Sequence, residues 1–282
     1  AGRVALAIPT SPCRLGFMNA EPDPAAAARA LLAFWRAAGV DMDLAEAVYA
    51  APKAAAPAPK REAPIAAPRL KKVAAAPVDA ARALAARAQT VAELRAAVEQ
   101  FDGCALKATA RNTVFSDGPE DAPVLIIGEA PGKDEDEQGK PFVGRSGQLL
   151  DRMLAQIGLS RKSNVLISNT IYWRPPGNRD PTDGELLACL PFAERLVALT
   201  QPKLLLLAGK SAAHAMLKRT DGVLKLRGRR LNYAREGHAP VNAMVMLHPA
   251  YLLRQPQQKR LAWTDLLLAE AWLNELGVAR AS

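Results

Sequence analysis

The sequence predicts an α/β protein: a three-layer α/β/α sandwich around a central, mainly parallel, four-stranded sheet, with a helical and Ala/Pro-rich N-terminal extension. Three observations predict this class. Beyond residue 120 the chain contains short runs that are apolar throughout, such as PVLIIG and KLLLLAG. Helical stretches separate these runs from one another. Strands of this kind alternating with helices are typical of a parallel sheet covered on both faces.

The first part of the chain has a different composition. A helix is expected over residues 24–38, because Leu31, Leu32 and Trp35 recur at helical spacing. Residues 51–77 contain six prolines, six Lys or Arg residues and one acid. Such a composition is typical of an extended, flexible, basic linker.

A second Ala-rich helical stretch covers residues 79–100 and is broken near Gln89 and Thr90. At this break Thr90 and Glu93 have the spacing of a capping box. We therefore divide the chain into a helical extension, an Ala/Pro-rich basic linker and a catalytic domain, at residues 1–50, 51–78 and 79–282.

The remaining elements alternate between strand and helix. Strands are expected at 123–128, 164–169, 203–209 and 243–248, and helices at 145–158, 182–200, 210–218 and 256–276. Parallel sheets bind ligands at the carboxyl ends of their strands. Here these ends carry glycine or polar residues: Gly128-Glu129-Ala130, Asn169, Gly209-Lys210-Ser211 and His248. We expect these four ends to converge on one edge of the sheet.

The charge of the chain is uneven. The net charge is +9, and residues 209–260 alone hold eleven Lys or Arg and two acids. A clustered basic region is the electrostatic footprint of a polyanion partner, although a solvated basic face has the same composition. The chain lacks an apolar run of the ~18 residues that a membrane helix needs, and its start is too short in apolar residues for a signal peptide. We therefore expect a cytoplasmic protein without a membrane partner.

Two nucleotide-binding fingerprints fail on single positions. The dinucleotide loop requires a second glycine where this chain has Ala130, and the phosphate loop requires glycine at Leu204. An ATP or NAD site is therefore poorly supported. Ser211 could still bind a lone phosphate at the start of its helix, or simply cap that helix.

Three tracts stand out: GEAPGKDEDEQGKPFVG at 128–144, SNTIYWRPPGNRDPT and LHPAYLLR. With these tracts in this order, residues 98–275 resemble the uracil-DNA glycosylase superfamily, and within it family 4. The resemblance implies that the first tract is the catalytic and uracil-stacking loop and that the second recognises the base. It also implies that the third tract enters the minor groove of DNA.

The resemblance assigns the uracil pocket to Gly128, Ala130, Phe142 and Asn169. Phe142 matches the residue that stacks on uracil, and Asn169 matches the amide that pairs with the uracil edge. An Asn amide offers both a donor and an acceptor, which suits this pairing. Outside this context Phe142 would read as a core residue and Asn169 as a loop cap.

The resemblance also implies three catalytic residues. Glu129 and Glu135 match family positions that face the sugar, where a carboxylate orients water or stabilises developing positive charge. His248 would donate a hydrogen bond to uracil O2 and stabilise the departing anion. Family 1 has a water-activating Asp where this chain has Ala130. The sequence leaves open which glutamate holds the water.

The third tract supplies the expected contacts to DNA. Leu252 aligns with the wedge that fills the space left by a flipped base, with Tyr251 and Leu253 as alternatives. Arg254 would hold phosphate. Other expected backbone contacts are Lys210, Ser211 and the basic run at 225–235.

The cysteines depart from the family pattern. Family 4 enzymes bind a [4Fe–4S] cluster through four cysteines, and such clusters need thiolate ligands. Two ligand positions hold Phe101 and Trp173, so that Cys104 and Cys189 are the only matches. Cys13 is too remote to substitute. We therefore expect no cluster and no other metal or cofactor, with Phe101 and Trp173 packing into the vacated site.

The sequence thus predicts a monofunctional DNA glycosylase that removes uracil from single- or double-stranded DNA in base-excision repair and acts as a monomer. Deaminated purines are further candidate substrates. Two alternatives remain: a non-catalytic protein of the same fold that binds uracil or abasic DNA, and a nucleotide-dependent enzyme that uses Lys210 and Ser211. The intact set of Glu129, Glu135, Asn169 and His248 favours the glycosylase.

Overall fold

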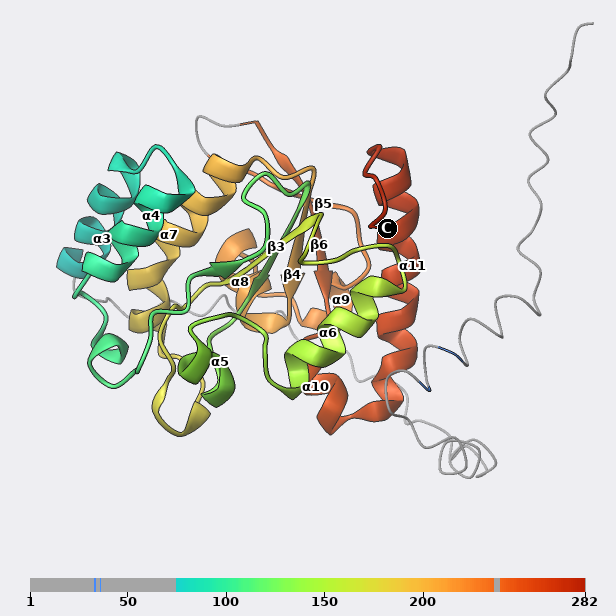
Figure 1. Cartoon of the computed structure of the whole chain (residues 1–282), viewed down its shortest axis with the longest axis horizontal. Coiled ribbons are helices and arrows are strands. Elements are labelled where there is room, and N and C mark those ends of the chain that lie inside the picture. The colour runs from blue at the N-terminus through green and yellow to red at the C-terminus, as the bar shows by residue number, and fades with distance from the viewer. Residues whose placement is uncertain (1–32, 34–35, 37–74, 236–238, 282) are drawn as a thin grey trace, which may run out of the picture.

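A computed structural model describes residues 33, 36, 75–235 and 239–281 of the chain. The helix expected over 24–38, apart from Ala33 and Arg36, and the expected linker up to residue 74 lie outside the described residues. The described part is built on one six-stranded sheet with the strand order β1-β3-β2-β4-β6-β5 (Figure 1).

The four expected strands form the centre of this sheet, and all pair in parallel: β2 (Val124–Gly128), β3 (Val165–Asn169), β4 (Leu204–Ala208) and β6 (Val241–Met246). Most of their residues are buried, as their continuous apolar runs predict. The sequence missed the two edge strands, which pair antiparallel: β1 (Ser116–Asp117) and β5 (Leu231–Tyr233). These strands have two and three residues, of which only Ser116 and Tyr233 are buried, so they carry no apolar run that would reveal them.

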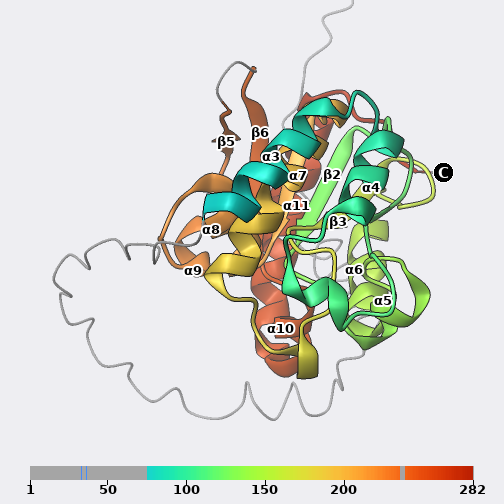
Figure 2. The same ribbon diagram turned by 90° about the vertical axis from the view of Figure 1, so that its left-hand side faces the viewer.

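Helices cover both faces of the sheet, which confirms the three-layer architecture (Figures 1 and 2). One layer consists of α3 (Ala75–Arg87), α4 (Val91–Gln100), α7 (Asp183–Thr200) and α8 (Lys210–Leu217). The other consists of α6 (Arg145–Ala155), α10 (Pro249–Arg254) and α11 (Lys259–Glu275). Successive strand residues point to opposite faces, so Leu125 packs in the first layer and Ile126 in the second. None of the described helices is long and apolar enough to cross a membrane.

Short helices lie in the connections: α5 (Lys133–Gln138), α9 (Val223–Leu226) and the 3-10 turns at Ala105–Ala108, Pro176–Asn178 and Pro256–Gln258. In Figure 1, α5 and α10 lie at the same end of the molecule. The carboxyl ends of the parallel strands point to this end, because β2 leads into the α5 segment and β6 into α10.

The break between α3 and α4 lies at the expected place. Helix α3 begins at Ala75, so the expected domain boundary at residue 79 falls inside this helix. Thr90 caps α4, and its hydroxyl accepts a hydrogen bond from the Glu93 amide at 3.1 Å. The Glu93 carboxylate reaches back to the Gln89 amide at 2.7 Å, one residue earlier than a capping box requires.

Candidate active site

A pocket of about 490 Å³ opens at the carboxyl edge of the parallel strands. Its lining includes residues at or just beyond the carboxyl ends of β2, β3, β4 and β6, namely Glu129, Asn169, Gly209 and His248. The expected convergence of the four strand ends is therefore confirmed. The pocket also contains Ala130, Glu135, Phe142, Lys210, Tyr251 and Arg254 from the predicted site.

Gly128, the last residue of β2, lies where the Asn169 side chain and the Phe142 ring approach each other. It pairs with Asn169 across β2 and β3. A Cβ atom on Gly128 would lie 2.5 Å from Asn169 Oδ1 and 2.5 Å from Phe142 Cζ. Only glycine therefore allows the Asn169 amide and the Phe142 ring to meet over the end of β2.

Asn169 is buried but has an unused acceptor. Its exposed fraction is 1 %, and its Oδ1 atom finds no hydrogen-bond partner among the described residues. Leaving a buried polar atom unsatisfied costs about 1–3 kcal/mol, so most folded proteins avoid it. Because Asn169 is a lining residue of the pocket, a donor on a bound molecule could satisfy this atom.

The ring of Phe142 lies beside the Asn169 amide, and the backbone of Phe142 is strained. Its φ is +54°, in the left-handed region, which costs a residue with a side chain about 1–2 kcal/mol. Its ring centroid lies 5.5 Å from that of His248, with 33° between the ring planes. Strain of this kind concentrates at functional sites.

His248 is held as a neutral hydrogen-bond donor. Its Nδ1 atom accepts the Ala250 amide hydrogen at 3.1 Å, where it caps the start of α10. The proton of the neutral ring is therefore on Nε2. Burial, assisted by the positive charge of Arg254, lowers the pKa of His248 to about 4. The imidazole stays uncharged at neutral pH.

Glu129 is the half-buried acid at the exit of β2. Burial raises its pKa, and the negative charge of Asp180 acts in the same direction. A hydrogen bond with the Ser211 side chain and the charge of Arg254 oppose this shift. The Glu129 carbonyl accepts hydrogen bonds from the residues that follow Asn169, which fixes its backbone beside β3.

Glu135 has a different environment. Its Oε1 atom accepts the Val143 and Gly144 amides, each at 2.9 Å, and its Oε2 atom accepts the Gly132 amide at 3.1 Å. The side chain is 7 % exposed. Both glutamates line the pocket, but three backbone donors occupy the Glu135 carboxylate, whereas the Glu129 carboxylate has the Ser211 side chain as its partner.

Of the other acids in this tract, Asp136 is buried and orders the loop that contains Arg111 and Asn112. Its Oδ1 atom accepts the Arg111 amide at 2.8 Å and the Asn112 amide at 3.3 Å. Asp134 and Glu137 are exposed. Two acids of the tract therefore line the pocket, Glu129 and Glu135, and the second of these also orders its own loop. Asp136 orders a neighbouring loop, and Asp134 and Glu137 are exposed.

The residues expected to contact DNA are separated by the structure. Lys210 and Arg254 are exposed, Tyr251 is half-buried, and all three line the pocket. Leu252 is 0 % exposed and packs in the core beneath α10. The expectation that Leu252 is the wedge is therefore wrong, because the inward face of this short helix is committed to the core. Tyr251 and Leu253 remain.

The basic run at 225–235 is partly paired within the protein. Arg227 bonds Asp265 at 2.7 Å and is largely buried. Arg230 pairs with Glu275 at 2.5 Å and lies over the Trp272 ring. These two cations are held by α11, which leaves less of the run free for phosphate than the sequence suggests.

Sequence reasoning missed several pocket residues. Three residues of the second tract also line the pocket: Asn178, Arg179 and Asp180. Arg179 bonds both carboxylate oxygens of Glu185, at 2.9 and 2.6 Å, and holds the pKa of Glu185 at about 2. Ser146 and Val223 also line the pocket. No sequence signal distinguished these two.

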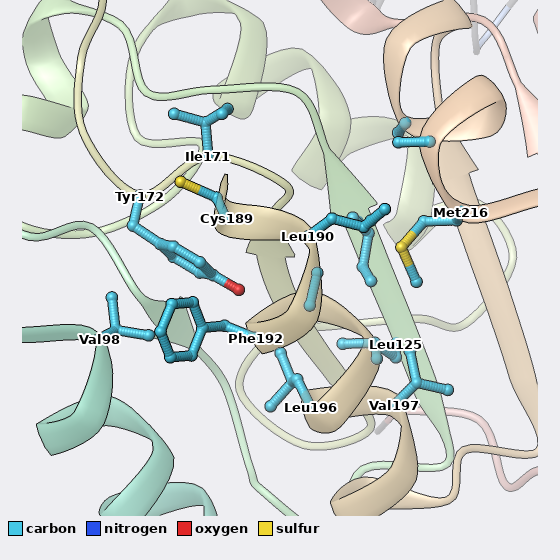
Figure 3. Close-up of a cluster of buried hydrophobic side chains, with 14 of the residues drawn as sticks. Val98, Leu125, Ile171, Tyr172, Cys189, Leu190, Phe192, Leu196, Val197 and Met216 are labelled. Atoms are coloured by element: carbon cyan, nitrogen blue, oxygen red, sulfur yellow. The ribbon is translucent and has the colours of Figure 1, made fainter. Parts of the chain in front are cut away.

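The region expected to replace an iron–sulfur cluster is apolar. Phe101 and Trp173 are 2 % and 1 % exposed, and both pack with other aromatic rings. The Cys104 and Cys189 thiols hydrogen-bond with each other, which lowers the pKa of Cys104 and raises that of Cys189. Figure 3 shows the Cys189 sulfur among the side chains of this core.

These residues do not fit a four-thiolate cluster. Of the four positions at which the family resemblance places cysteine ligands, two hold the aromatic side chains of Phe101 and Trp173, and the indole nitrogen of Trp173 already donates to Thr113 Oγ1 at 3.0 Å. The described residues contain no group of three or more His, Cys, Asp or Glu side chains placed to hold a metal ion.

Comparison with known proteins agrees with this geometry. A family model described as the uracil DNA glycosylase superfamily matches residues 115–271. A type-4 uracil-DNA glycosylase from Pyrobaculum aerophilum is 34% identical over 168 residues, which are 58% of this chain and 85% of that protein. One from Archaeoglobus fulgidus is 38% identical over 55% of this chain and 78% of its own length. One from Thermotoga maritima is 30% identical over 64% and 93%.

Proposed function

Because the chain belongs to the uracil DNA glycosylase superfamily, we propose that it hydrolyses the N-glycosidic bond of deoxyuridine in DNA, the first step of base-excision repair. The observation that carries the proposal is the unpartnered Asn169 oxygen, buried beside the Phe142 ring and in the same pocket as a neutral His248. An aromatic face and a fixed amide are the two features that read a flipped base.

In the proposed complex the uracil ring stacks on Phe142. The Asn169 amide pairs with the base edge: its oxygen accepts from N3–H and its NH₂ group donates to O4. Cytosine presents an acceptor at its N3 and a donor at its exocyclic amine, so both contacts would be reversed. A buried amide that reads donors and acceptors in this way rejects the wrong base strongly.

The bond between N1 and C1′ breaks with both electrons going to the uracil ring. His248 Nε2–H donates to O2 and stabilises this anion, and it does so without giving up its proton because the ring is neutral. Water then adds its oxygen to C1′, and Glu129 accepts the water proton. The raised pKa of Glu129 suits a general base, since proton transfer is most effective near the working pH.

We assign the water to Glu129 because the Glu135 carboxylate already holds three backbone amides. Of the described lysines only Lys210 lines the pocket, and it is exposed at the rim. Because the described lining of the pocket holds no buried amine that could attack C1′, the proposed product is an intact strand with an abasic site. Heating the product in alkali should cleave the strand, and borohydride should trap no covalent complex.

For duplex DNA we propose Tyr251 as the wedge, because it lines the pocket and keeps part of its surface exposed. Lys210 and Arg254 flank the same opening as exposed cations that suit phosphates. A protein that works this way needs no second copy, and we propose that it acts as a monomer.

We also propose that the protein works without an iron–sulfur cluster, because aromatic packing occupies the ligand positions. Iron content and visible absorbance of the protein as purified test this directly. Less than about 0.1 iron per chain supports the proposal, whereas about four irons per chain, as a [4Fe–4S] cluster needs, would overturn it.

The substrate experiment is an excision assay on oligonucleotides that carry uracil, hypoxanthine, xanthine or thymine, in single and double strands. Uracil release from both forms is expected, with hypoxanthine and xanthine as the candidate slower substrates and thymine as the negative control. Binding of uracil DNA at stoichiometric protein, with no base released, would identify a lesion-binding protein instead.

A further inference from the structure

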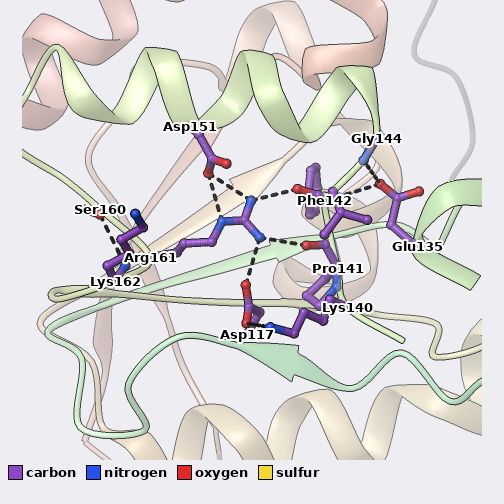
Figure 4. A network of polar contacts seen from close by, with 11 residues as sticks. Asp117, Glu135, Lys140, Pro141, Phe142, Gly144, Asp151, Ser160, Arg161 and Lys162 are labelled. Atoms are coloured by element: carbon purple, nitrogen blue, oxygen red, sulfur yellow. Dashed lines mark hydrogen bonds and ion pairs between the residues drawn. The ribbon is translucent and has the colours of Figure 1, made fainter. Parts of the chain in front are cut away.

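Arg161 lies behind the pocket and has no place in the chemistry above. Its guanidinium is 13% exposed and makes four hydrogen bonds. Two go to carboxylates, Asp151 at 2.9 Å and Asp117 at 3.1 Å. The other two go to consecutive carbonyls, Pro141 at 2.8 Å and Phe142 at 2.7 Å (Figure 4).

The Phe142 carbonyl and the Val143 amide belong to one peptide group, and in a trans peptide they point to opposite sides. Arg161 holds the oxygen of this peptide at 2.7 Å. Glu135 holds its N–H at 2.9 Å, and the next N–H, of Gly144, at the same distance. The peptide group between Phe142 and Val143 is therefore hydrogen-bonded to a buried cation through its oxygen and to a buried carboxylate through its N–H.

This peptide directly follows the strained residue that carries the stacking ring. Helix α6 approaches the same turn so closely that a Cβ on Gly147 would lie 1.8 Å from the Phe142 oxygen. The turn thus has no room to relax toward α6, and its carbonyl and amide are both held by charged groups. Hydrogen bonds to charged partners are the stronger ones.

We propose that Arg161 is a positioning residue that fixes the orientation of the Phe142 ring. Arg161 holds the carbonyl of the peptide after Phe142 and Glu135 holds its N–H, and we call these two side chains the clamp. Asp117 and Asp151 supply the negative charge that lets a cation remain at this depth. The proposal rests on the proposed function, in which Phe142 stacks on uracil. It also gives Glu135 a part in catalysis that does not require contact with water or substrate.

The test is a double-mutant cycle on single-turnover uracil excision, with Arg161→Met, Phe142→Ala and the combination. Arg161→Met alone should lower the rate roughly 10- to 100-fold, the range for loss of a positioning contact. In the Phe142→Ala background the same change should cost less than about twofold, because residues that act as a unit are non-additive. An equal fold-loss in both backgrounds, or no loss in either, would overturn the proposal.

Arg195→Met is the matched control. Arg195 is half-buried and also donates two hydrogen bonds to a carbonyl, that of Ala88, at 2.9 and 2.6 Å, but it lies on α7 away from the pocket. Its replacement should leave the excision rate within about twofold of the wild type. If Arg161→Met does not fold, Arg161→Lys replaces it, since an ammonium keeps the charge and loses the fork geometry.

A second readout does not depend on excision. Hydrogen exchange of the Val143 and Gly144 amides, measured by NMR without DNA, reports how often these amides lose their hydrogen bonds to Glu135. Arg161→Met should accelerate this exchange at least about tenfold and Arg195→Met should not. Unchanged exchange would show that the turn holds without Arg161. If the wild type releases no uracil, the proposed function fails, and this measurement still decides whether the clamp exists.

Discussion

Two buried asparagines stand at opposite ends of β3, and their amides are treated differently. Asn164, just before the strand, accepts the Ser160 amide at 2.8 Å and donates to the carbonyls of Gly158 and Ala279 at 3.0 and 2.9 Å. Asn169, at the end of the strand, keeps an oxygen that no described residue satisfies. One amide is complete without a ligand, and the other is not.

The difference separates a structural asparagine from one that awaits a partner. A folded protein gains by satisfying buried polar atoms, so an exception at the lining of a pocket indicates a ligand. The pocket and the aromatic region around Phe101 and Trp173 differ in other respects. In the pocket the backbone of Phe142 is strained and burial raises the pKa of Glu129, whereas Phe101 and Trp173 are buried against other aromatic rings and do not line the pocket.

The largest effect is expected at Asn169. Asn169→Ala should lower uracil excision roughly 100- to 1,000-fold and remove the preference for uracil over cytosine, as loss of a preorganised hydrogen-bonding group does. Its thermal stability should be unchanged or slightly higher, because an unsatisfied acceptor is removed. Single-turnover kinetics and thermal melting measure the two effects.

Asn164→Ala is the matched comparison. It should cost about 1–3 kcal/mol of stability, because backbone groups at the Ser160 turn and near the C-terminus lose their partner. Excision per folded molecule should stay within about twofold of the wild type. If Asn164→Ala lowers the rate as much as Asn169→Ala, the contrast between the two ends of β3 is not functional.

A somewhat smaller loss is expected at His248. His248→Ala should lower the excision rate roughly 100-fold, the low end of the range for loss of one oxyanion donor, while binding of DNA with a non-cleavable deoxyuridine analogue changes little. Parallel losses of rate and affinity would instead identify a histidine that only holds α10 in place.

His248 also links stability to pH. Its folded-state pKa is about 4, below the ordinary value of 6.5 for an unfolded chain. Between these values the unfolded state binds a proton that the folded state does not, so stability should fall as pH decreases from about 6.5 to 4. In His248→Ala this part of the slope should be absent in denaturant unfolding measured across that range.

The pH profile of excision tests Glu129. A base must be ionised to accept the water proton, and burial raises the pKa of this carboxyl. The rate should therefore fall on the acid side, beginning above the ordinary carboxyl range, and Glu129→Gln should be slow and lack this limb. If Glu135→Gln removes the limb instead, the two glutamates have been assigned the wrong way round.

The smallest effect on excision is expected in the aromatic region. Trp173→Ala should destabilise the protein by about 3–5 kcal/mol through the cavity it leaves. The conservative Phe101→Leu should cost less than about 1.5 kcal/mol. Excision by the folded fraction should change less than about twofold for either. A large loss of rate at preserved stability would show that this region takes part in the reaction.

Much of the fold was predictable, because apolar runs mark buried parallel strands and their polar ends mark the pocket. The edge strands β1 and β5 were not, since two or three residues are too few to show a pattern of buried and exposed positions. Leu252 was misplaced because a six-residue helix gives too little periodicity to show which side faces inward. Arg161 was invisible because two of its partners are backbone carbonyls about 20 residues away, and a carbonyl has no sequence signature.

The proposal that the protein removes uracil from DNA and reads the base with Asn169 is tested most directly by measuring free uracil. The substrate is an oligonucleotide with a single deoxyuridine, and the reaction is followed for one turnover with protein in excess. If the protein hydrolyses deoxyuridine as proposed, the wild type should release one uracil per strand and leave an alkali-labile abasic site at that position, and Asn169→Ala should lower the rate at least about 100-fold. An intact base in a stable protein–DNA complex, or equal release by wild type and Asn169→Ala, would contradict this proposal.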